Sequence, residues 1–489
     1  MKLKELLRDV CVLESNMDME TEVNDIKYDS RAVEQGDVFV AIAGFETDGH
    51  KYIPSAMAKG AAAVICQMRP DEGVPFVRVA DSRLALALMA KAYFGDPASS
   101  MTMVGVTGTN GKTTTTLLLK HVLEQVCGAK VGLIGTNSNM IGDEEIPTEH
   151  TTPESYELQK LFRRMADSGC THVVMEVSSH SLSLSRVAGV RYAVGLFTNL
   201  TQDHLDFHGT MENYAEAKAM LFSQCDKGVV NLDDSWAKLM LENAKCPMMS
   251  FSVNSMEGDL IANDLRISPS GVKFVALHGT AGLARVSMPI PGRFSVYNAL
   301  GVIACCLSLG LDMQSCVEAL KNAKGVKGRV EVVPTDGDYH ILIDYAHTPD
   351  ALENVLKSMK DTAEGRVVAL FGCGGDRDRT KRPIMGAIAA KCADFVIVTS
   401  DNPRTEEPKA ILDDILAGMK GSRTPYVVIE NRPQAIAYAI DNHLPGDIII
   451  LAGKGHETYQ IIGKVKNHMD ERELVAEHLA LRAAKKEKE

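Results

Sequence analysis

The sequence has no CxxC pair, no long apolar run and no surplus of basic residues. Its 11 cysteines are odd in number and scattered, which argues against a disulfide framework or a structural zinc site. No segment reaches the roughly 18 consecutive apolar residues of a membrane span, and no apolar stretch follows the basic start "MKLKELLRDV". We therefore expect reduced, mostly buried thiols, a cytoplasmic protein and no membrane insertion.

Positive charge is scarce as well. The chain has 52 Lys and Arg against 64 Asp and Glu, a formal net charge of −12. A general nucleic-acid binder needs the opposite balance because phosphate backbones attract Lys and Arg, so no nucleic-acid partner is expected. The 45% of hydrophobic and 24% of charged residues are typical of a globular protein.

The length and the pattern of apolar runs predict three domains of mixed α/β structure. A chain of 489 residues is too long for a single hydrophobic core. Residues 1–98 contain the short strand-like runs "DVFVAIAG" and "AAAVICQ" and end at the linker-like "YFGDPASS". Strands and helices alternate over residues 99–330, which predicts a parallel sheet with crossover helices. No tandem repeat or low-complexity tract interrupts the chain.

The pattern starts anew over residues 331–489. Four apolar runs there, "YHILIDYAH", "RVVALFGCGG", "ADFVIVTSDNP" and "DIIILAGKGHE", each end in a polar loop. Ligands of open parallel sheets bind at the carboxyl ends of the strands. These loops are therefore candidates for a ligand site.

The segment "VGVTGTNGKTTTT", residues 104–116, predicts a phosphate-binding loop between a strand and a helix. Gly108 and Gly111 allow backbone N–H groups to converge on a phosphate at the start of the helix. Lys112 supplies a positive charge, and the Thr113 hydroxyl is placed to bind Mg²⁺. The strict Walker pattern has a glycine where this chain has Val106.

A phosphate loop predicts a nucleotide but no particular reaction. A switch GTPase needs an NKxD-type guanine reader, which is absent. Glu176 ends the apolar run "THVVMEVSSH" and suits a metal ligand near the phosphates. His204 and His208 have the i,i+4 spacing of a zinc pair, but no third soft ligand is evident. Lys218 by itself reads as a solvated helix lysine, because an ammonium cannot bind Mg²⁺.

Nine motifs taken in order resemble the Mur ligases of peptidoglycan synthesis. They are "TGTNGKTTT", "MEVSSH", "TNLTQDHLDFHGTMENYAEAK", "YNALGVIA", "GRVEVV", "DYAHTPDAL", "GCGGDRDRTKRP", "DNPRTEEP" and "GKGHE". The resemblance covers essentially the whole chain. It implies a small UDP-sugar-binding α/β domain, a central P-loop ATPase with a parallel-rich sheet, and a C-terminal Rossmann-like domain that receives an amino acid. It also suggests a monomer.

The resemblance implies ATP as co-substrate and Mg²⁺ as cofactor. It assigns the catalytic and metal-binding roles to Lys112, Thr113, Glu176, His204 and Lys218, with Lys218 carbamylated so that it can bind metal. The implied ATP-binding residues are Gly108, Thr109, Asn110, Gly111, Lys112, Thr113, Thr114, Asn298, Arg329, Asp344 and His347. Asn298 taken alone fits a helix cap better than an adenine contact.

The first substrate implied by the resemblance is UDP-MurNAc-L-Ala-D-Glu. Its implied contacts are Ser30, Thr151, Thr152, Ser178 and Arg186. Some family members carry glutamine where this chain has Leu184, which leaves the role of that position open.

The second substrate is expected to be meso-2,6-diaminopimelate. Its distal end carries a carboxylate, which suits the guanidinium groups of Arg377 and Arg404, and an ammonium, which suits Asp401 and Glu457. Lysine lacks that carboxylate, and unpartnered arginines in a closed site disfavour it. Without the resemblance, "DNPR" reads as an Asx-Pro turn with a surface arginine. The full implied set is Arg377, Asp401, Asn402, Pro403, Arg404, Gly453 and Glu457.

The implied reaction is ATP-dependent amide ligation through an acyl phosphate. Addition of L-lysine in place of diaminopimelate is the alternative. A folylpolyglutamate-type ligase would share the ATPase but would not need the first domain or "DNPR". A nucleotide-sensing switch or scaffold without catalysis would keep the loop and lack the metal-binding and acceptor residues.

Overall fold

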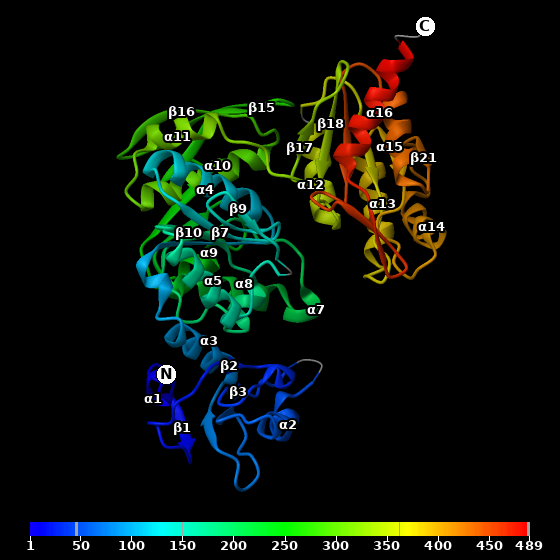
Figure 1. The fold of residues 1–489 in the computed structure, drawn as a ribbon. Helices are drawn as coiled ribbons and strands as arrows, with labels where there is room; N and C mark the ends of the chain where they lie inside the picture. Colours follow the sequence, from blue (N-terminus) through cyan, green and yellow to red (C-terminus); the bar gives the residue numbers. More distant parts are fainter. Residues whose placement is uncertain (45–46, 149, 361, 487–489) are drawn as a thin grey trace. The chain divides into compact units, whose positions relative to one another are not determined.

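The computed structural model describes residues 1–44, 47–148, 150–360 and 362–486, which form a mixed α/β fold (Figure 1). The strands lie in three larger sheets and one two-stranded hairpin. The chain divides into two compact units, Met1–Phe251 with Gly301–Asp312, and Ser252–Leu300 with Met313–Glu489. No helix within the described ranges is long and apolar enough to cross a membrane.

The first sheet lies within residues 1–98 and has five strands in the order β1-β5-β4-β3-β2. β2 to β5 are parallel, and β1 pairs antiparallel with β5. All residues of β4 are buried, because helices cover the sheet and both of its faces carry apolar side chains. The elements are α1 (Leu3–Leu6), β1 (Val12–Ser15), β2 (Ile26–Lys27), β3 (Val38–Val40), α2 (Ile53–Ala58), β4 (Ala63–Cys66), β5 (Phe76–Val79) and α3 (Ser82–Tyr93).

Six parallel strands follow in the same unit, in the spatial order β13-β12-β11-β6-β10-β7, and the antiparallel β8 and β9 extend the β7 edge. The register pairs Glu176 with Val106 and Phe197 with Thr107. The loops after β6, β10 and β11 therefore leave the same edge of the sheet. The strands are β6 (Thr102–Thr107), β7 (Val131–Ile134), β8 (Asn139–Ile141), β9 (Glu144–Ile146), β10 (His172–Glu176), β11 (Tyr192–Phe197), β12 (Cys225–Asn231) and β13 (Met248–Ser252).

Helices cover this sheet because each carries an apolar stripe. α4 (Lys112–Cys127) packs against β6, β7 and β10. α5 (Ser155–Asp167) places Leu158, Phe162 and Met165, spaced by one helical turn, in a cluster with buried strand residues. The predicted alternation of parallel strands and crossover helices is confirmed for this region.

The second unit contains an antiparallel meander that the sequence analysis did not predict. β14 (Leu260–Ser268), β15 (Gly271–His278) and β16 (Gly282–Met288) pair consecutively through short turns. In β15 the buried Val272, Phe274 and Ala276 alternate with Lys273, which is exposed. This period of two produces a strand with one covered face, and the tight turns leave no room for a crossover helix.

The third sheet has the order β17-β18-β22-β19-β20-β21 and contains the four apolar runs predicted as strands. β18 to β22 pair in parallel, as expected for a Rossmann-like domain. Apolar residues of α12, α13 and α14 join one buried cluster, and those of α15 and α16 join another. The elements are β17 (Glu331–Val333), β18 (Tyr339–Asp344), α12 (Pro349–Lys360), β19 (Val367–Phe371), α13 (Lys381–Cys392), β20 (Phe395–Val398), α14 (Pro408–Met419), β21 (Tyr426–Val428), α15 (Arg432–Asp441), β22 (Asp447–Ala452) and α16 (Glu471–Lys486).

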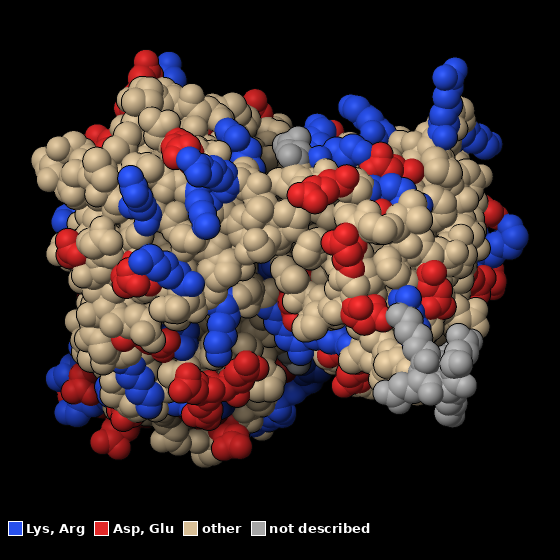
Figure 2. Space-filling view, turned by 90° about the horizontal axis from the view of Figure 1, so that it is seen from above, with Lys and Arg blue, Asp and Glu red and all other residues tan. Residues whose placement is uncertain are grey.

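Charged side chains are mixed over the surface that Figure 2 draws. Lys and Arg lie among Asp and Glu, separated by uncharged residues. The face shown therefore carries no continuous field of one sign, which is the feature that a nucleic-acid interface would need.

A fully buried ion pair joins α15 to the start of α16. Arg432 and Glu471 are both 0% exposed, and Arg432 Nε donates to Glu471 Oε1 at 2.8 Å. Arg432 also donates to the Ala452 carbonyl at the end of β22. Burial raises the pKa of Glu471.

Replacing Arg432 with methionine leaves the Glu471 carboxyl buried without its partner. We expect R432M to lower the free energy of unfolding by about 3–5 kcal/mol, measured by urea unfolding. The control is K409M, which breaks the exposed pair of Lys409 with Asp413 and costs about 1 kcal/mol or less. Equal losses in the two variants would contradict the role given to the buried pair.

Candidate active site

The predicted phosphate loop connects β6 to α4. Gly108 has φ +147° and lies so close to the loop after β11 that an added Cβ would be 1.9 Å from Thr198 Oγ1. Thr109 N donates to the Asn199 carbonyl and Asn110 N to Asn199 Oδ1, so this neighbouring loop holds the turn in place. α4 begins at Lys112 without a side-chain cap, after Gly111 at φ +85°. An uncapped helix start of this kind favours an anion.

Two lysines meet at the phosphate loop. Lys112 Nζ donates to the carbonyls of Gly108 and Thr109, at 2.8 Å each. Lys218 is 1% exposed in α8 (Met211–Ala219), and its Nζ donates to the same Gly108 carbonyl at 2.8 Å. Burial and the nearby Lys112 ammonium lower the pKa of Lys218 well below its usual value. The interpretation of Lys218 as a solvated helix lysine is therefore wrong.

Glu176 ends β10 and is 1% exposed. Its Oε1 accepts from Thr136 N at 2.9 Å and its Oε2 from Thr136 Oγ1 at 3.0 Å. Thr136, in the loop after β7, thus fixes the direction of the carboxylate. Sequence reasoning missed this residue, because no local motif marks the partner of an acid 40 positions away.

The two histidines with zinc-like spacing lie in different environments. His204 has φ +52°, and its side chain is 47% exposed. His208 is buried, stacks on Tyr214, and its Nε2 lies 2.9 Å from Ser179 Oγ. Burial lowers the pKa of His208 to about 4. The contacts of the His208 ring are thus with Ser179 and Tyr214 inside the protein.

The available donor atoms fit Mg²⁺ in part. Thr113 and Glu176 offer the oxygen atoms that Mg²⁺ prefers, whereas unmodified Lys218 offers none. Across the described residues, no group of three or more His, Cys, Asp or Glu side chains could hold a metal ion. A complete metal site therefore needs oxygen atoms from a bound nucleotide or from a modified Lys218.

Four of the residues predicted to bind the first substrate form one cluster beside Glu176. Thr152 Oγ1 donates to the Glu176 carbonyl at 2.9 Å and accepts from Ser178 N at 3.2 Å. Arg186 Nη1 donates to the Thr152 carbonyl, and Thr151 Oγ1 lies 3.0 Å from Thr136 Oγ1. Leu184 ends α6 (Ser179–Ser183) as its C-cap residue and joins no hydrogen bond of this cluster through its side chain.

The fifth of these residues, Ser30, begins a short 3-10 helix after β2 and is 8% exposed. The same loop carries Tyr28, whose pKa is raised by burial and by Glu157 and Glu154. Glu154 accepts from Arg186 Nε at 3.2 Å. The loop of Ser30 therefore lies on the side of the cluster that contains Arg186.

Three of the predicted ATP-binding residues of the second unit, Arg329, Asp344 and His347, lie at or next to Tyr345. The Arg329 guanidinium lies 5.0 Å from the centre of the Tyr345 ring, and the His347 ring is tilted against it with the ring centres 4.7 Å apart. Asp344 is buried and accepts from Val330 N and Ala346 N, at 2.8 Å each. Burial raises the pKa of Asp344 and lowers that of His347.

Asn298 lies inside a helix. α10 (Arg293–Ser308) begins five residues before it, so Asn298 is not the cap of that helix. It is 7% exposed. The alternative interpretation of Asn298 as a helix cap is therefore wrong, because the helix starts directly after Gly292.

The predicted acceptor loop "DNPR" follows β20 and is held by the hairpin of β23 (Tyr459–Ile462) and β24 (Val465–His468). Arg404 N donates to the Ile461 carbonyl, and Gly463 N donates to the Arg404 carbonyl. Arg404 has φ +52°, and its Nη1 donates to the Gly375 carbonyl at 2.8 Å. Gly375 lies so close to Pro403 that a Cβ atom added to Gly375 would be 1.9 Å from the Pro403 carbonyl oxygen.

The other predicted acceptor residues converge on this loop. Asp401 Oδ2 would be 2.6 Å from a Cβ at Gly453, whose φ is +111°. Asn402 Nδ2 donates to Glu457 Oε2 at 2.9 Å. Arg377 is exposed, and its Nη1 donates to the Asp376 carbonyl. Lys454, which lies between Gly453 and Glu457 in "GKGHE", is fully buried here and was missed by the sequence analysis.

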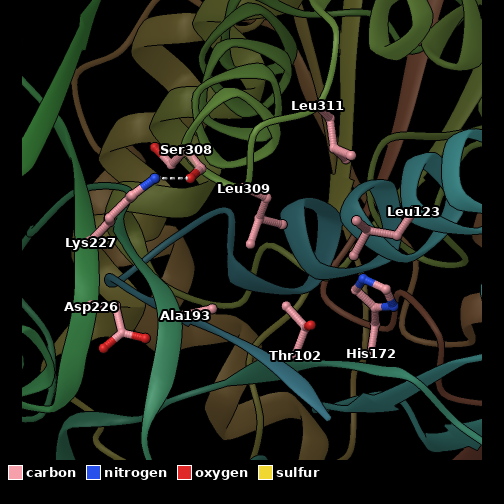
Figure 3. A pocket seen from close by; sticks show the side chains of 9 residues that line it. All are labelled: Thr102, Leu123, His172, Ala193, Asp226, Lys227, Ser308, Leu309 and Leu311. Carbon is pink, nitrogen blue, oxygen red and sulfur yellow. Dashed lines mark hydrogen bonds between the residues drawn. The ribbon is translucent and has the colours of Figure 1, made fainter.

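A cavity of about 350 Å³ lies at the opposite edge of the central sheet (Figure 3). Its floor includes residues at the beginnings of strands: Thr102 of β6, His172 of β10 and Asp226 of β12. Lys227 Nζ reaches from this edge to the carbonyl of Ser308 at 2.6 Å. The cavity is thus distinct from the loops that carry the predicted site residues, which follow the carboxyl ends of the strands.

Three family patterns match successive parts of the chain. The pattern described as "Mur ligase family, catalytic domain" matches residues 22–94, "Mur ligase middle domain" matches residues 106–306, and "Mur ligase, glutamate ligase domain" matches residues 328–455. The chain belongs to the Mur ligase family. The resemblance seen in the sequence motifs is thereby confirmed.

Close relatives of this Mur ligase share one name. A protein of Caldanaerobacter subterraneus subsp. tengcongensis named "UDP-N-acetylmuramoyl-L-alanyl-D-glutamate--2,6-diaminopimelate ligase" is 48% identical over 94% of this chain and 95% of its own. A protein of Clostridioides difficile with that name is 45% identical over 98% of this chain and 100% of its own. A solved structure titled with the same enzyme has TM-score 0.75 and 33% identity over 99% of both chains.

The geometry at Gly108 leads to a test of the phosphate loop. A methyl group there collides with Thr198 Oγ1 and the backbone of Asn199, so the loop must shift. We expect G108A to weaken binding of a fluorescent ATP analogue by about tenfold or more. The added methyl group costs about 1–3 kcal/mol in steric strain, which distorts the loop that would bind the phosphates. The control is G128A at the other end of α4, where φ is also positive and nothing lies within 4 Å. Equal affinities of the two variants would contradict a phosphate site here.

Proposed function

We propose that this Mur ligase joins meso-2,6-diaminopimelate to the D-Glu γ-carboxylate of UDP-MurNAc-L-Ala-D-Glu, with ATP converted to ADP and phosphate. The observation that carries the proposal is the full-length match to relatives that are named for this reaction and are 45–48% identical. The geometry supports it, because the predicted residues gather in clusters at loops that follow the carboxyl ends of parallel strands.

The first step activates a carboxylate that cannot react with an amine at neutral pH. A γ-carboxylate oxygen of D-Glu attacks the γ-phosphorus of ATP, the bond to the β,γ-bridging oxygen breaks, and ADP leaves. The product is an acyl phosphate. Carboxylate and triphosphate repel each other, so the transferred charge has to be stabilised. Lys112 supplies positive charge at the phosphate loop once it turns from the Gly108 and Thr109 carbonyls to a bound phosphate.

The second step forms the amide. An amine of diaminopimelate attacks the acyl carbon, the bond from that carbon to the phosphate oxygen breaks, phosphate leaves, and the nitrogen loses a proton. Arg404 and Arg377 would bind the distal carboxylate of the acceptor, and Asp401 and Glu457 its distal ammonium. L-lysine has no distal carboxylate, and the relatives are named for diaminopimelate, so lysine is not favoured as acceptor.

The other binding residues have roles that follow from their clusters. Thr151, Thr152, Ser178 and Arg186 would bind the peptide part of the UDP-sugar, with Ser30 toward its diphosphate. Asn298, Arg329, Asp344 and His347 would bind the adenosine and phosphates of ATP. The donor set proposed for Mg²⁺ is Thr113, Glu176, His204 and Lys218 as a carbamate. Bound Mg²⁺ would screen the negative charge of the phosphates.

Carbamylation of Lys218 is chemically reasonable in this environment. A lowered pKa favours the neutral amine, which can add to carbon dioxide and lose a proton to give a carbamate. The product is an oxygen-bearing anion beside Lys112, in place of a second cation.

We further propose that the chain has three domains, over residues 1–98, 99–330 and 331–489. We also propose that the protein is a monomer and is located in the cytoplasm.

The main test measures phosphate release from ATP with UDP-MurNAc-L-Ala-D-Glu present. We expect meso-diaminopimelate to support a rate about 100-fold or more above that with L-lysine, because guanidinium groups left without a carboxylate partner in the closed site cost several kcal/mol. A reaction without any acceptor gives the background rate. Comparable rates with the two amino acids would refute the assignment of the acceptor.

A second test concerns Lys218. K218A removes the proposed metal-binding carbamate, and we expect about a 100-fold or greater loss of activity, with partial recovery on addition of formate or acetate. The control is K160A, which removes an exposed lysine and leaves activity unchanged. Unaltered activity of K218A, or a loss that no short carboxylate relieves in a variant that still binds ATP, would overturn the carbamate.

A further inference from the structure

Lys454 is a fully buried lysine in the middle of the predicted acceptor loops. It is 0% exposed and follows β22 in the motif "GKGHE". Its Nζ lies 2.5 Å from Glu457 Oε2 and 2.9 Å from Asn402 Oδ1. A buried ammonium is costly unless it is paired and hydrogen-bonded, so these two contacts are what makes its position tolerable.

The ammonium fixes the orientation of the Asn402 amide. Asn402 Oδ1 accepts from Lys454 Nζ and from Ile461 N, at 2.9 Å each. Its Nδ2 must therefore face the other way, and it donates to Glu457 Oε2 at 2.9 Å. The three side chains form a closed triangle of hydrogen bonds, tied by Ile461 to β23.

Both hydrogen bonds that Glu457 accepts in the triangle go to the same carboxylate oxygen. Oε2 accepts from both Lys454 and Asn402, whereas no hydrogen bond from a described residue reaches Oε1. The Glu457 side chain is 14% exposed. One aimed oxygen therefore remains for a ligand, and Lys454 has already balanced the charge of the carboxylate.

We propose that Lys454 is a positioning residue that sets acceptor specificity by holding and neutralising Glu457. This inference rests on the proposed function. Because the positive charge of Lys454 offsets the negative charge of Glu457, the positive charges of Arg404 and Arg377 outnumber the negative charge of Asp401. The proposed site therefore favours an acceptor whose distal end carries a carboxylate as well as an ammonium. A bare distal ammonium, as in lysine, meets an added positive charge at Lys454 Nζ.

The direct test replaces Lys454 with methionine, which keeps an unbranched side chain, is one atom shorter and removes the charge. We expect kcat/KM for diaminopimelate to fall by about tenfold or more, since Glu457 loses its orientation, while kcat/KM for lysine does not fall. The ratio of the two constants thus decreases. KM for ATP and for UDP-MurNAc-L-Ala-D-Glu stays unchanged, which a general loss of structure would not produce.

The matched control is K466M. Lys466 and Lys454 both lie over the Tyr459 ring. The distance from Nζ to the ring centre is 4.6 Å for Lys466 and 5.2 Å for Lys454, but Lys466 is exposed. We expect K466M to behave like the wild type. Equal diaminopimelate-to-lysine ratios in K454M and K466M would overturn the proposal.

A double-mutant cycle shows whether Lys454 acts through Glu457. We expect E457Q to lower kcat/KM for diaminopimelate, and K454M/E457Q to lose no more than about two- to threefold beyond the worse single variant. Losses that multiply would mean independent roles and would overturn the proposal. Failure of the wild-type enzyme to release phosphate with diaminopimelate would instead refute the proposed function, so the two failures are distinguishable.

Discussion

Two lysines donate to one carbonyl oxygen, and much of the first unit is arranged around that contact. Lys112 and Lys218 both reach the carbonyl of Gly108, one from the helix that starts at the loop and one from a helix 100 residues further along the chain. Burial and the repulsion between the two ammonium groups both lower the pKa of Lys218. The position of Gly108 in turn depends on the loop of Thr198 and Asn199, because the backbone approach there leaves no space for a side chain. The loop of Thr198 and Asn199 thus positions Gly108, and the Gly108 carbonyl brings Lys112 and Lys218 together.

The two units hold their predicted site residues by the same means. In each, parallel strands end at a common edge, and polar side chains at or near that edge form hydrogen bonds with the backbone. Thr152 Oγ1 donates to the Glu176 carbonyl and accepts from Ser178 N. The Asp344 carboxylate accepts from Val330 N and Ala346 N. Buried polar groups that are satisfied in this way cost little and leave few alternative arrangements. Rigid binding groups are useful to an enzyme that must keep water away from an acyl phosphate.

The fold was largely predictable from the sequence, because parallel sheets covered on both faces leave apolar runs such as "DIIILAGKGHE" that end at turns. The phosphate loop was predictable for a similar reason, since its glycines and lysine are adjacent in the chain. The contacts that aim the side chains were not, because they join distant segments. Thr136 directs Glu176 from the loop after β7, and Ile461 fixes Asn402 from a hairpin 59 residues away. The meander of β14 to β16 was not predicted, because a strand such as β15 alternates buried and exposed residues and forms no continuous apolar run. The position of Asn298 within a helix depended on where that helix begins, which local residues indicate poorly.

The hairpin of β23 and β24 holds the predicted acceptor loop mainly through its own backbone atoms. Arg404 N and the Arg404 carbonyl bond to the main chain of the hairpin, and Ile461 N donates to the Asn402 side chain. The Gln460 side chain adds a bond to the Asp401 carbonyl. Main-chain bonds are kept when side chains change. Mutations on the hairpin surface or in the loop can therefore change the side chains of the predicted acceptor site while the main-chain frame stays in place. A protein built in this way can acquire a preference for a different amino acid in small steps, each of which leaves a folded enzyme for selection to act on.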